Sequence, residues 1–402
     1  MALIVKKFGG TSVADKDRIF NVANIIADDY KKGNEIIVVV SAQGDTTDDL
    51  IEKAKEINSD NPSKREMDML LTAGEQISAA LLAMAIEKLG CPVISLLGWQ
   101  AGFTTDSNHG IARIKRIKTD RMKAELARGN IIIVAGFQGI NKYDDMTTLG
   151  RGGSDTSAVA IAASLHADRC QIYTDVDGVY TADPRKVENA KKLSEITYDE
   201  MLELATLGAQ VLNNRSVEMA KKYNVELEVL SSLEKTEGTI VRENTKMEKM
   251  LIRGVTNDKN VATISVIGLK DLPGIAFKLF NKLAQHKINV DMILQSVGRD
   301  GTKDITFTLA RDNADSAIEA IESLKSIFQY QSLSRDDKVS KVSIVGAGME
   351  SHPGVAAKMF EALYDADVNI RMIASSEIKI SVLIDEEKSA QAVKAVHDAF
   401  IG

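Results

Sequence analysis

Apolar runs rich in β-branched residues alternate with stretches of helical periodicity up to about residue 240 of the chain. The expected strands read ALIVKKF, EIIVVVSA, PVISLLG, NIIIVAGF, RCQIYTDV and VELEVLS, and the expected helices span 15–31, 65–89 and 156–165. Strands this apolar, with helices between them, are typical of a largely parallel sheet covered on both faces. Ligands of such sheets bind at the carboxyl ends of the strands. The pattern predicts an α/β fold whose functional residues follow its strands.

The pattern changes after a charged connector, RENTKMEKM, because the chain then repeats itself. Segment 264–296 matches segment 344–376 at a constant offset of 80 residues, which aligns Pro273 with Pro353 and Asn289 with Asn369. Each copy continues into a further strand and a second helix. We interpret this as a β-α-β-β-α unit written twice, an internal duplication.

Composition narrows the class of protein. A chain of 402 residues is too long for one core, so two or three domains are expected. The net charge of -7 and the lack of a basic stripe argue against nucleic-acid binding. The only cysteines, Cys91 and Cys170, form no C-x-x-C pair, which suits a reducing cytosol. We find no signal peptide and no run long enough to cross a membrane, so we expect a cytoplasmic protein without a membrane partner.

The first candidate motif, KFGGTS, follows the first expected strand. Glycines after a strand let backbone N–H groups approach an anion, and Lys7 adds a point charge suited to a β- or γ-phosphate. The Walker spacing is absent, because Lys7 precedes Gly9 and Gly10. A plain turn capped by Thr11 or Ser12 explains this motif, taken alone, about equally well.

A second glycine loop, TLGRGGSDTSA, repeats the design with hydroxyls, one cation and a following helix. Asp155 is an ordinary helix cap in one interpretation; beside a phosphate it orients Lys7 or a hydrated Mg²⁺ ion. Arg151 offers a bidentate fork for a carboxylate. Two anion-binding loops in one domain predict a donor phosphate and an anionic acceptor.

Three further pieces are ambiguous. The stretch YTDVDGVYTADPR has two interpretations. In one it frames an adenosine, with Arg185 reaching phosphates. In the other, which we favour for this motif alone, it is a loop with an Asp-Gly turn. Ser41 and Thr47 follow the second strand as substrate donors or as a capped helix start. Glu75 begins an otherwise apolar run, either as a first-turn acid favoured by the helix dipole or as the partner of a substrate ammonium group.

Other chemistries lack their motifs. The five histidines are scattered without H-E-x-x-H spacing, and no G-x-S-x-G or protein-kinase motif is present. A reaction that depends on positioning and charge fits best, as in phosphoryl transfer.

KFGGTSV, LTAGEQIS, GRGGSDTSA and TDVDGVYTADPR, followed by the doubled module, together resemble the aspartokinases of the amino-acid kinase family. The resemblance covers essentially the whole chain, which closely resembles the Gram-positive and actinobacterial type. It implies an amino-acid kinase fold, with a mainly parallel central sheet and helices on both faces, plus two ferredoxin-like βαββαβ ACT domains. The implied domains are a catalytic domain at 1–240, a linker with the first strand of the second ACT domain at 241–260, ACT domain 1 at 261–335 and ACT domain 2 at 336–402.

The resemblance also implies an activity: transfer of the ATP γ-phosphoryl group to the β-carboxylate of L-aspartate, with ATP and Mg²⁺ and no prosthetic group. The product, 4-phospho-L-aspartate, begins the biosynthesis of lysine, threonine and methionine, and lysine or threonine would inhibit through the ACT domains. The implied assembly is a homodimer through the ACT domains or a heterotetramer with an in-frame small subunit. Since an aspartate carboxylate has a pKa of about 3.9, the reaction needs no general base.

Roles carry over to matching positions, with no metal ligand directly assigned. The catalytic residues would be Lys7, Arg151 and Asp155. Aspartate would be bound by Ser41, Thr47, Glu75, Arg151 and Ser154. ATP would be bound by Lys7, Gly9, Gly10, Ser12, Thr174, Asp175, Tyr180 and Arg185. Effectors would contact Asp271, Gly274, Ile275, Ala276, Asn289, Val290, Asp291 and Gln295 in the first copy. In the second copy they would contact Val355, Ala356, Asn369, Ile370, Ser376 and Glu377.

Several points stay open. Gln210 replaces a lysine that many relatives have near the nucleotide, and some relatives have threonine where Ala356 stands. A glutamate 5-kinase is an alternative, opposed by the doubled ACT module and by Glu75. A non-catalytic amino-acid sensor is another, opposed by the intact Lys7, Arg151 and Asp155. The sequence does not say which end product inhibits, or whether an internal start such as Met146 yields a small subunit.

Overall fold

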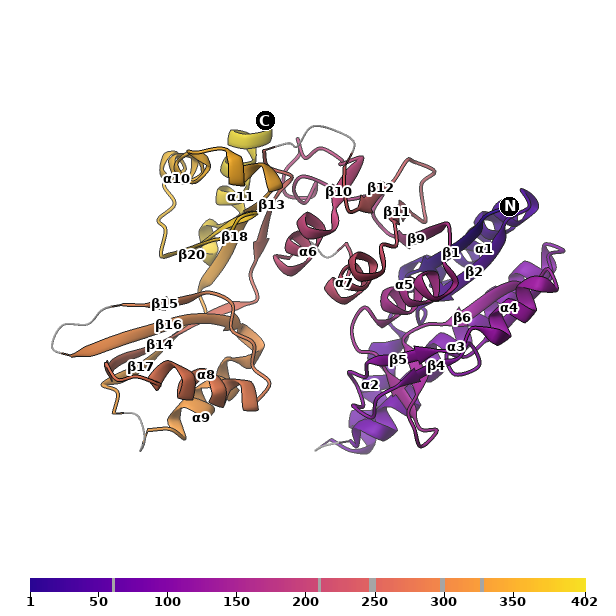
Figure 1. The fold of residues 1–402 in the computed structure, drawn as a ribbon, viewed down its shortest axis with the longest axis horizontal. Helices are drawn as coiled ribbons and strands as arrows, with labels where there is room; N and C mark the ends of the chain where they lie inside the picture. The colour runs from indigo at the N-terminus through magenta and orange to yellow at the C-terminus, as the bar shows by residue number, and fades with distance from the viewer. Residues whose placement is uncertain (60–61, 209–210, 246–250, 297–300, 326–328) are drawn as a thin grey trace. The chain divides into compact units, whose positions relative to one another are not determined.

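The structure is a computed structural model that describes the chain except residues 60–61, 209–210, 246–250, 297–300 and 326–328 (Figure 1). It divides into two compact units. Unit 1 comprises Met1–Tyr180, Lys192–Thr206 and Gln210–Glu248. Unit 2 comprises Thr181–Lys191, Leu207–Ala209 and Lys249–Gly402.

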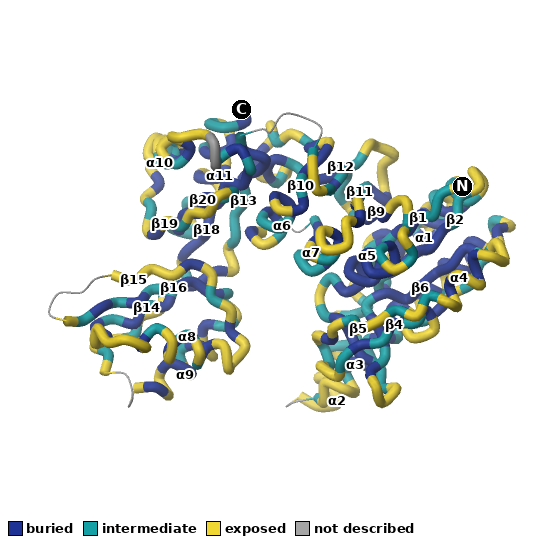
Figure 2. Tube along the Cα trace, viewed as in Figure 1, coloured by how far each residue is buried: buried dark blue, intermediate teal, exposed yellow. Residues whose placement is uncertain are grey.

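Unit 1 is built around an eight-stranded sheet in the order β10-β12-β11-β9-β1-β2-β6-β3. All neighbouring strands run parallel except β11 and β12, which run antiparallel. The sheet is therefore largely parallel, as the sequence pattern predicts. The inner strands are buried along almost their whole length, which is why they read as continuous apolar runs (Figure 2). The strands are β1 (Leu3–Phe8), β2 (Glu35–Val40), β3 (Val93–Leu96), β6 (Ile131–Ala135), β9 (Arg169–Thr174), β10 (Glu195–Thr197), β11 (Leu227–Ser231) and β12 (Thr239–Arg242).

Helices α1 and α3 pack together with the sheet in one large hydrophobic core, while α5 packs against β1, β2 and β9. By length and composition alone, α3 could cross a membrane, which the sequence did not lead us to expect. However, half of its most apolar 18-residue stretch is buried inside the structure. Its apolar character is explained by packing against α1, β3 and β6. The helices of unit 1 are α1 (Lys16–Lys31), α2 (Thr46–Ile57), α3 (Lys64–Lys88), α4 (Asp120–Ala127), α5 (Gly153–Leu165), α6 (Tyr198–Thr206) and α7 (Asn214–Tyr223).

A second, four-stranded sheet of unit 1 has the order β5-β4-β7-β8 and was not predicted from the sequence. Its strands have three or four residues each, too few to carry a recognisable alternation. The sheet matters because β8 leads directly into the second glycine loop. Its strands are β4 (Phe103–Thr105), β5 (Ile114–Ile117), β7 (Gln138–Ile140) and β8 (Met146–Thr148).

Unit 2 contains both copies of the repeat. The first copy forms the sheet β15-β16-β14-β17 and has its own core. Its elements are β14 (Val261–Lys270), α8 (Ile275–Gln285), β15 (Ile293–Gln295), β16 (Thr302–Ala310), α9 (Ala314–Glu322) and β17 (Ser332–Asp336).

The second copy forms the sheet β13-β18-β20-β19. Since β13 precedes the first copy in the chain and pairs antiparallel with β18, the first copy is inserted into the second. The resemblance leads to this same expectation. The elements are β13 (Gly254–Asp258), β18 (Val339–Val345), α10 (Val355–Asp365), β19 (Met372–Ser375), β20 (Lys379–Asp385) and α11 (Ser389–Ile401).

Segment Thr181–Lys191 lies in unit 2, although the sequence places it within the 1–240 domain. Ala182 and Val187 are buried in the core of the second copy. The backbone N–H of Val255 donates to the carbonyl of Thr181 at 2.7 Å. This short segment is therefore structurally part of the second ACT copy.

Candidate active site

A cavity of 780 Å³ lies in unit 1, beyond the carboxyl ends of β1 and β2. It is bordered by the loops after these strands, by α2 and α3, and by the second glycine loop with the start of α5. The catalytic and aspartate-binding residues expected from the sequence all line it, together with one glycine of the first loop: Lys7, Gly10, Ser41, Thr47, Glu75, Arg151, Ser154 and Asp155.

Lys7 and Asp155 form an ion pair in the cavity. Lys7 is the penultimate residue of β1, a central strand, and Asp155 lies in the first turn of α5. The distance from Lys7 Nζ to Asp155 Oδ1 is 2.7 Å, and each side chain is 12% exposed. A long, flexible lysine is thereby held at the carboxyl edge of the sheet, where it presents a fixed positive charge to a ligand.

The first glycine loop allows two chain segments to approach each other closely. A Cβ atom on Gly10 would lie 2.5 Å from the carbonyl oxygen of Ala42, so only glycine fits there. Gly9 and Ser12 do not line the cavity: Gly9 N donates to Tyr173 O at 3.3 Å, and the buried Ser12 hydroxyl lies 2.8 Å from that of Ser232.

The second glycine loop has left-handed backbone at Gly150 and Gly152, with φ of 80° and 67°. Because Gly152 caps the helix in this conformation, α5 begins at Gly153 rather than at Thr156, where the sequence pattern places it. Ser154 and Asp155 therefore belong to the first helical turn. The positive end of the α5 dipole faces the cavity that these residues line.

Two side chains from residues 213–215, which read NNR, hold this loop by hydrogen bonds and were not predicted from the sequence. Arg215 donates from Nη1 to Leu149 O at 2.8 Å and from Nη2 to Ala112 O at 2.9 Å. Asn213 Nδ2 donates to Arg151 O at 3.2 Å. Burial lowers the pKa of Arg215. The backbone that carries Arg151 is thus fixed from behind by two side chains.

Glu75 lies in the middle of α3, so its interpretation as a first-turn acid is wrong. Its Oε1 accepts from Ala42 N at 3.1 Å. Within the described part of the chain, Oε2 has no hydrogen-bond partner although it is buried. Burial raises the pKa of Glu75 to about 7. A buried carboxylate with one unsatisfied oxygen in a cavity wall is suited to bind a cationic group.

Asp68 and His109 also line the cavity and were not singled out from the sequence. Asp68 precedes Glu75 by seven residues on α3, a spacing that places both on one helix face. That spacing was a usable signal. His109 lies in an irregular loop, and nothing in the sequence marks it.

The match to known proteins extends over the whole chain. The model of the amino acid kinase family matches residues 2–231, and models of the ACT domain match residues 262–328 and 342–400. An aspartokinase of Bacillus sp. (strain MGA3) is 50% identical over 401 residues, covering 100% of this chain and 97% of the relative. The chain belongs to the aspartokinases.

Solved structures agree with this assignment. E. coli aspartokinase III in complex with aspartate and ADP, described as the R-state, has a TM-score of 0.86 at 26% identity, with 100% of each chain covered. The T-state of the same enzyme, in complex with lysine and aspartate, has a TM-score of 0.76 at 26% identity, again with 100% of each chain covered. The aspartokinase fold, with its kinase unit and two ACT copies, is the fold described above.

The residues expected at the ATP site of this aspartokinase are divided between the units. Thr174 ends β9 in unit 1, and its hydroxyl donates to Asp175 Oδ1 at 3.0 Å. The Tyr180 hydroxyl donates to Asp177 Oδ1 at 2.8 Å. Arg185 lies in unit 2 with its side chain 87% exposed, and its Nε is 2.9 Å from Asp183 Oδ1. These residues do not line the cavity, and Gln210 lies outside the described residues.

The expected effector residues all lie in unit 2. Gly274 and Gly354 precede α8 and α10 in left-handed conformation, with φ of 88° and 94°. In the first copy, Asp271 pairs with Lys303 at 3.1 Å, and Asp291 forms an ion pair with Lys341 of the second copy. The structure places Asn289, Val290, Gln295, Ile275 and Ala276 in the first copy, and Val355, Ala356, Asn369, Ile370, Ser376 and Glu377 in the second.

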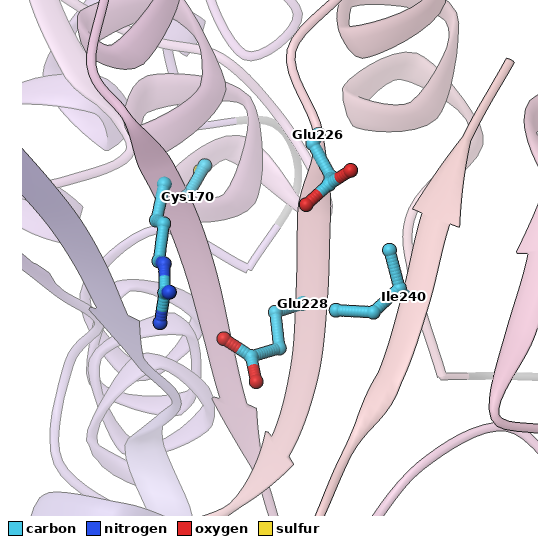
Figure 3. Close-up of a pocket in the computed structure, with 5 residues that line it drawn as sticks. Cys170, Glu226, Glu228 and Ile240 are labelled. Atoms are coloured by element: carbon cyan, nitrogen blue, oxygen red, sulfur yellow. The ribbon is translucent and has the colours of Figure 1, made fainter.

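A smaller cavity of 210 Å³ lies near the amino-terminal ends of β9 and β11 of the main sheet (Figure 3). Arg169 and Cys170 start β9, and Glu226 and Glu228 lie at the start of β11. The glycine loops are at the carboxyl ends of the strands, so this cavity is separate from the active site. Among the described residues, no group of three or more His, Cys, Asp or Glu is arranged to hold a metal ion.

Proposed function

We propose that this chain transfers the γ-phosphoryl group of ATP to the β-carboxylate of L-aspartate, giving 4-phospho-L-aspartate and ADP. One observation carries the proposal: the cavity brings the Lys7–Asp155 pair together with the unsatisfied carboxylate of Glu75 and with Arg151. These groups match the charges of an amino acid and a phosphate. The complex of E. coli aspartokinase III with aspartate and ADP supports the same pairing of ligands.

In this proposal Glu75 binds the ammonium group of aspartate, and Arg151 binds a carboxylate through its planar fork. The hydroxyls of Ser41, Thr47 and Ser154 complete the amino-acid site. A β-carboxylate oxygen attacks the γ-phosphorus, the bond from that phosphorus to the β,γ-bridging oxygen breaks, and ADP leaves with the electron pair. The nucleophile is already ionised at neutral pH, because the ordinary pKa of an aspartate side chain is about 3.9, so the step needs no general base.

Lys7 stabilises the negative charge of the transferring group, and Asp155 orients Lys7. The phosphates lie at Gly10 and the first glycine loop, with Gly9 and Ser12 as structural supports. Thr174, Asp175 and Tyr180 are our candidates for the nucleoside side. We assign no ATP contact to Arg185.

Bound Mg²⁺ would neutralise phosphate charge. Asp155 fits a role near such an ion, since it is a carboxylate at the same cavity as Lys7. The described residues offer no three-ligand cluster, so the ion would be held largely by phosphates and water.

We further propose that the activity starts lysine, threonine and methionine biosynthesis in the cytoplasm, and that lysine or threonine inhibits it through the ACT copies. The expected effector positions, the doubled module and the lysine complex of E. coli aspartokinase III support this. The assembly would be a homodimer through ACT domains, or a heterotetramer with an in-frame small subunit.

The test is ADP release with aspartate or glutamate as acceptor. We expect turnover with aspartate; turnover with glutamate alone would overturn the proposal.

Lys7→Ala is expected to lower kcat by at least about 100-fold, the scale of losing one preorganised charge stabiliser. Lysine or threonine binding, measured by calorimetry, should persist in that variant. Lys16→Ala removes an exposed lysine of α1 and is the matched control. Unchanged activity in Lys7→Ala would refute the role of Lys7.

A further inference from the structure

Asp68 is a buried carboxylate that joins three parts of the cavity wall. The residue is 1% exposed and lies on α3. Its oxygens accept from His109 Nδ1 at 2.8 Å, from Gly110 N at 3.0 Å and from Thr148 Oγ1 at 2.6 Å. The helix that carries Glu75 is thereby tied both to the loop around His109 and to the end of β8.

The two segments that Asp68 holds also contact each other. Ala112 N donates to Thr148 O at 2.8 Å. A Cβ atom added to Gly150 would lie 3.1 Å from the carbonyl oxygen of Gly110, so the His109 loop abuts the second glycine loop. Thr148 is two residues before Gly150 in the chain. Any shift of Asp68 is therefore transmitted to the backbone next to Arg151.

The contact with Asp68 fixes the imidazole of His109. A carboxylate oxygen can only accept, so Nδ1 carries the proton in this contact, and Nε2 is the ring nitrogen left for other partners. His109 lines the cavity and its side chain is 17% exposed. Loss of Asp68 would release this side chain at the cavity wall.

We propose that Asp68 is a positioning residue for the amino-acid side of the cavity. It acts through His109 and Gly110, which it holds against the second glycine loop, and thereby sets the affinity for the acceptor amino acid. The inference rests on the proposed function, because it assumes that the acceptor is bound by Glu75 and Arg151. It assigns no proton transfer to Asp68 or His109.

The test is steady-state kinetics of Asp68→Asn in the full-length chain. We expect the KM for aspartate to rise about tenfold, the scale of one charge-assisted hydrogen bond, while kcat changes by less than about threefold and the KM for ATP is unchanged. His109→Ala should raise the same KM, and His109→Asn, which retains a donor for Asp68, should recover part of it. If Asp68 acts through His109, the effects of Asp68→Asn and His109→Ala will be less than additive.

Glu125→Gln is the matched control. Glu125 is also 1% exposed and accepts from Arg128 and Asn130, but it does not line the cavity. It should lower thermal stability without changing the KM for aspartate. If Asp68→Asn behaves in the same way, Asp68 is only structural and the inference is overturned.

If Asp68→Asn does not fold, Thr148→Val removes a single donor to Asp68 with little change of shape. An unchanged KM for aspartate in this variant and in His109→Ala would equally overturn the inference. Failure of the proposed function is seen separately, as the absence of aspartate-dependent ADP release in the wild-type chain.

Discussion

The carboxyl group of Glu75 is buried in the cavity wall, since only 4% of the residue is exposed to solvent. Burial raises its pKa from 4.5 to about 7. Between these values the folded chain holds a proton that the unfolded chain has lost, so the contribution of Glu75 to stability falls as the pH rises. Above about pH 7 it is constant at its least favourable value. A bound ammonium group would compensate the charge, so binding and stability place opposite demands on this residue.

Glu75→Gln removes the buried charge and the ammonium partner together. From the pKa shift, the wild-type chain should lose about 2 kcal/mol of this contribution between pH 5.5 and pH 8, and the variant should not. Calorimetric melting at both pH values is therefore expected to show that the stability of the variant relative to the wild-type chain is greatest at pH 8. Its KM for aspartate should rise at least about tenfold. Glu87→Gln, an exposed site on the same helix, is the control. Equal effects at the two pH values would contradict the pKa of Glu75.

At the level of single residues, the sequence predicted those side chains that stand in motifs. Lys7 follows an expected strand beside glycines, and Arg151 and Asp155 stand in a second glycine loop that leads into an expected helix, so their meeting at the carboxyl ends of a parallel sheet could be anticipated. The spacing of Asp68 from Glu75 places both on one helix face, but the partners of Asp68 could not be anticipated, and neither could those of Arg215. These hydrogen bonds reach residues at least 40 positions away in the chain. Pairings at such separation are decided by tertiary packing.

The two glycine loops are the elements on which the site depends. Each lets the chain come closer to a neighbouring segment than any side chain would permit, Gly10 to Ala42 and Gly152 to Asn213. At Gly152 a positive φ is added to this lack of space. The sequence identified both loops but placed the start of α5 at Thr156, since glycine is a poor helix former. The structure begins the helix earlier because Gly152 adopts a conformation that other residues avoid.

Gly152→Ala tests this requirement against a matched site. Its Cβ would overlap the side chain of Asn213, so the loop must move and carry Arg151 with it. We expect a loss of about 1–3 kcal/mol of stability and at least about a tenfold loss of kcat/KM for aspartate. Gly33 also has a positive φ, of 87°, but nothing lies within 4 Å of an added Cβ. Gly33→Ala should therefore keep full activity, and equal activity losses in the two variants would contradict the steric argument.

Across the whole molecule, the chain passes from unit 1 into unit 2 after Tyr180 and returns at Lys192. The excursion is anchored within unit 2: Thr181 Oγ1 lies 2.9 Å from His397 Nε2, and Lys191 Nζ donates to Ile401 O at 2.6 Å. A motif that reads as one piece, TDVDGVYTADPR, is thus divided between two units. The sequence could not reveal this, because Ala182 and Val187 are too few to indicate which core they join.

Val187→Ala tests whether this segment is an integral part of the second ACT copy. Val187 is 1% exposed and packs in the core with residues of α10 and α11, so its truncation should cost about 2 kcal/mol. Because the loss falls on unit 2, amide hydrogen exchange should accelerate in α10 and α11 and stay unchanged in α1. Glu188→Ala, at the exposed neighbouring position, should alter neither region. Faster exchange in α1 with α11 unchanged would assign the segment to unit 1 and contradict the division described above.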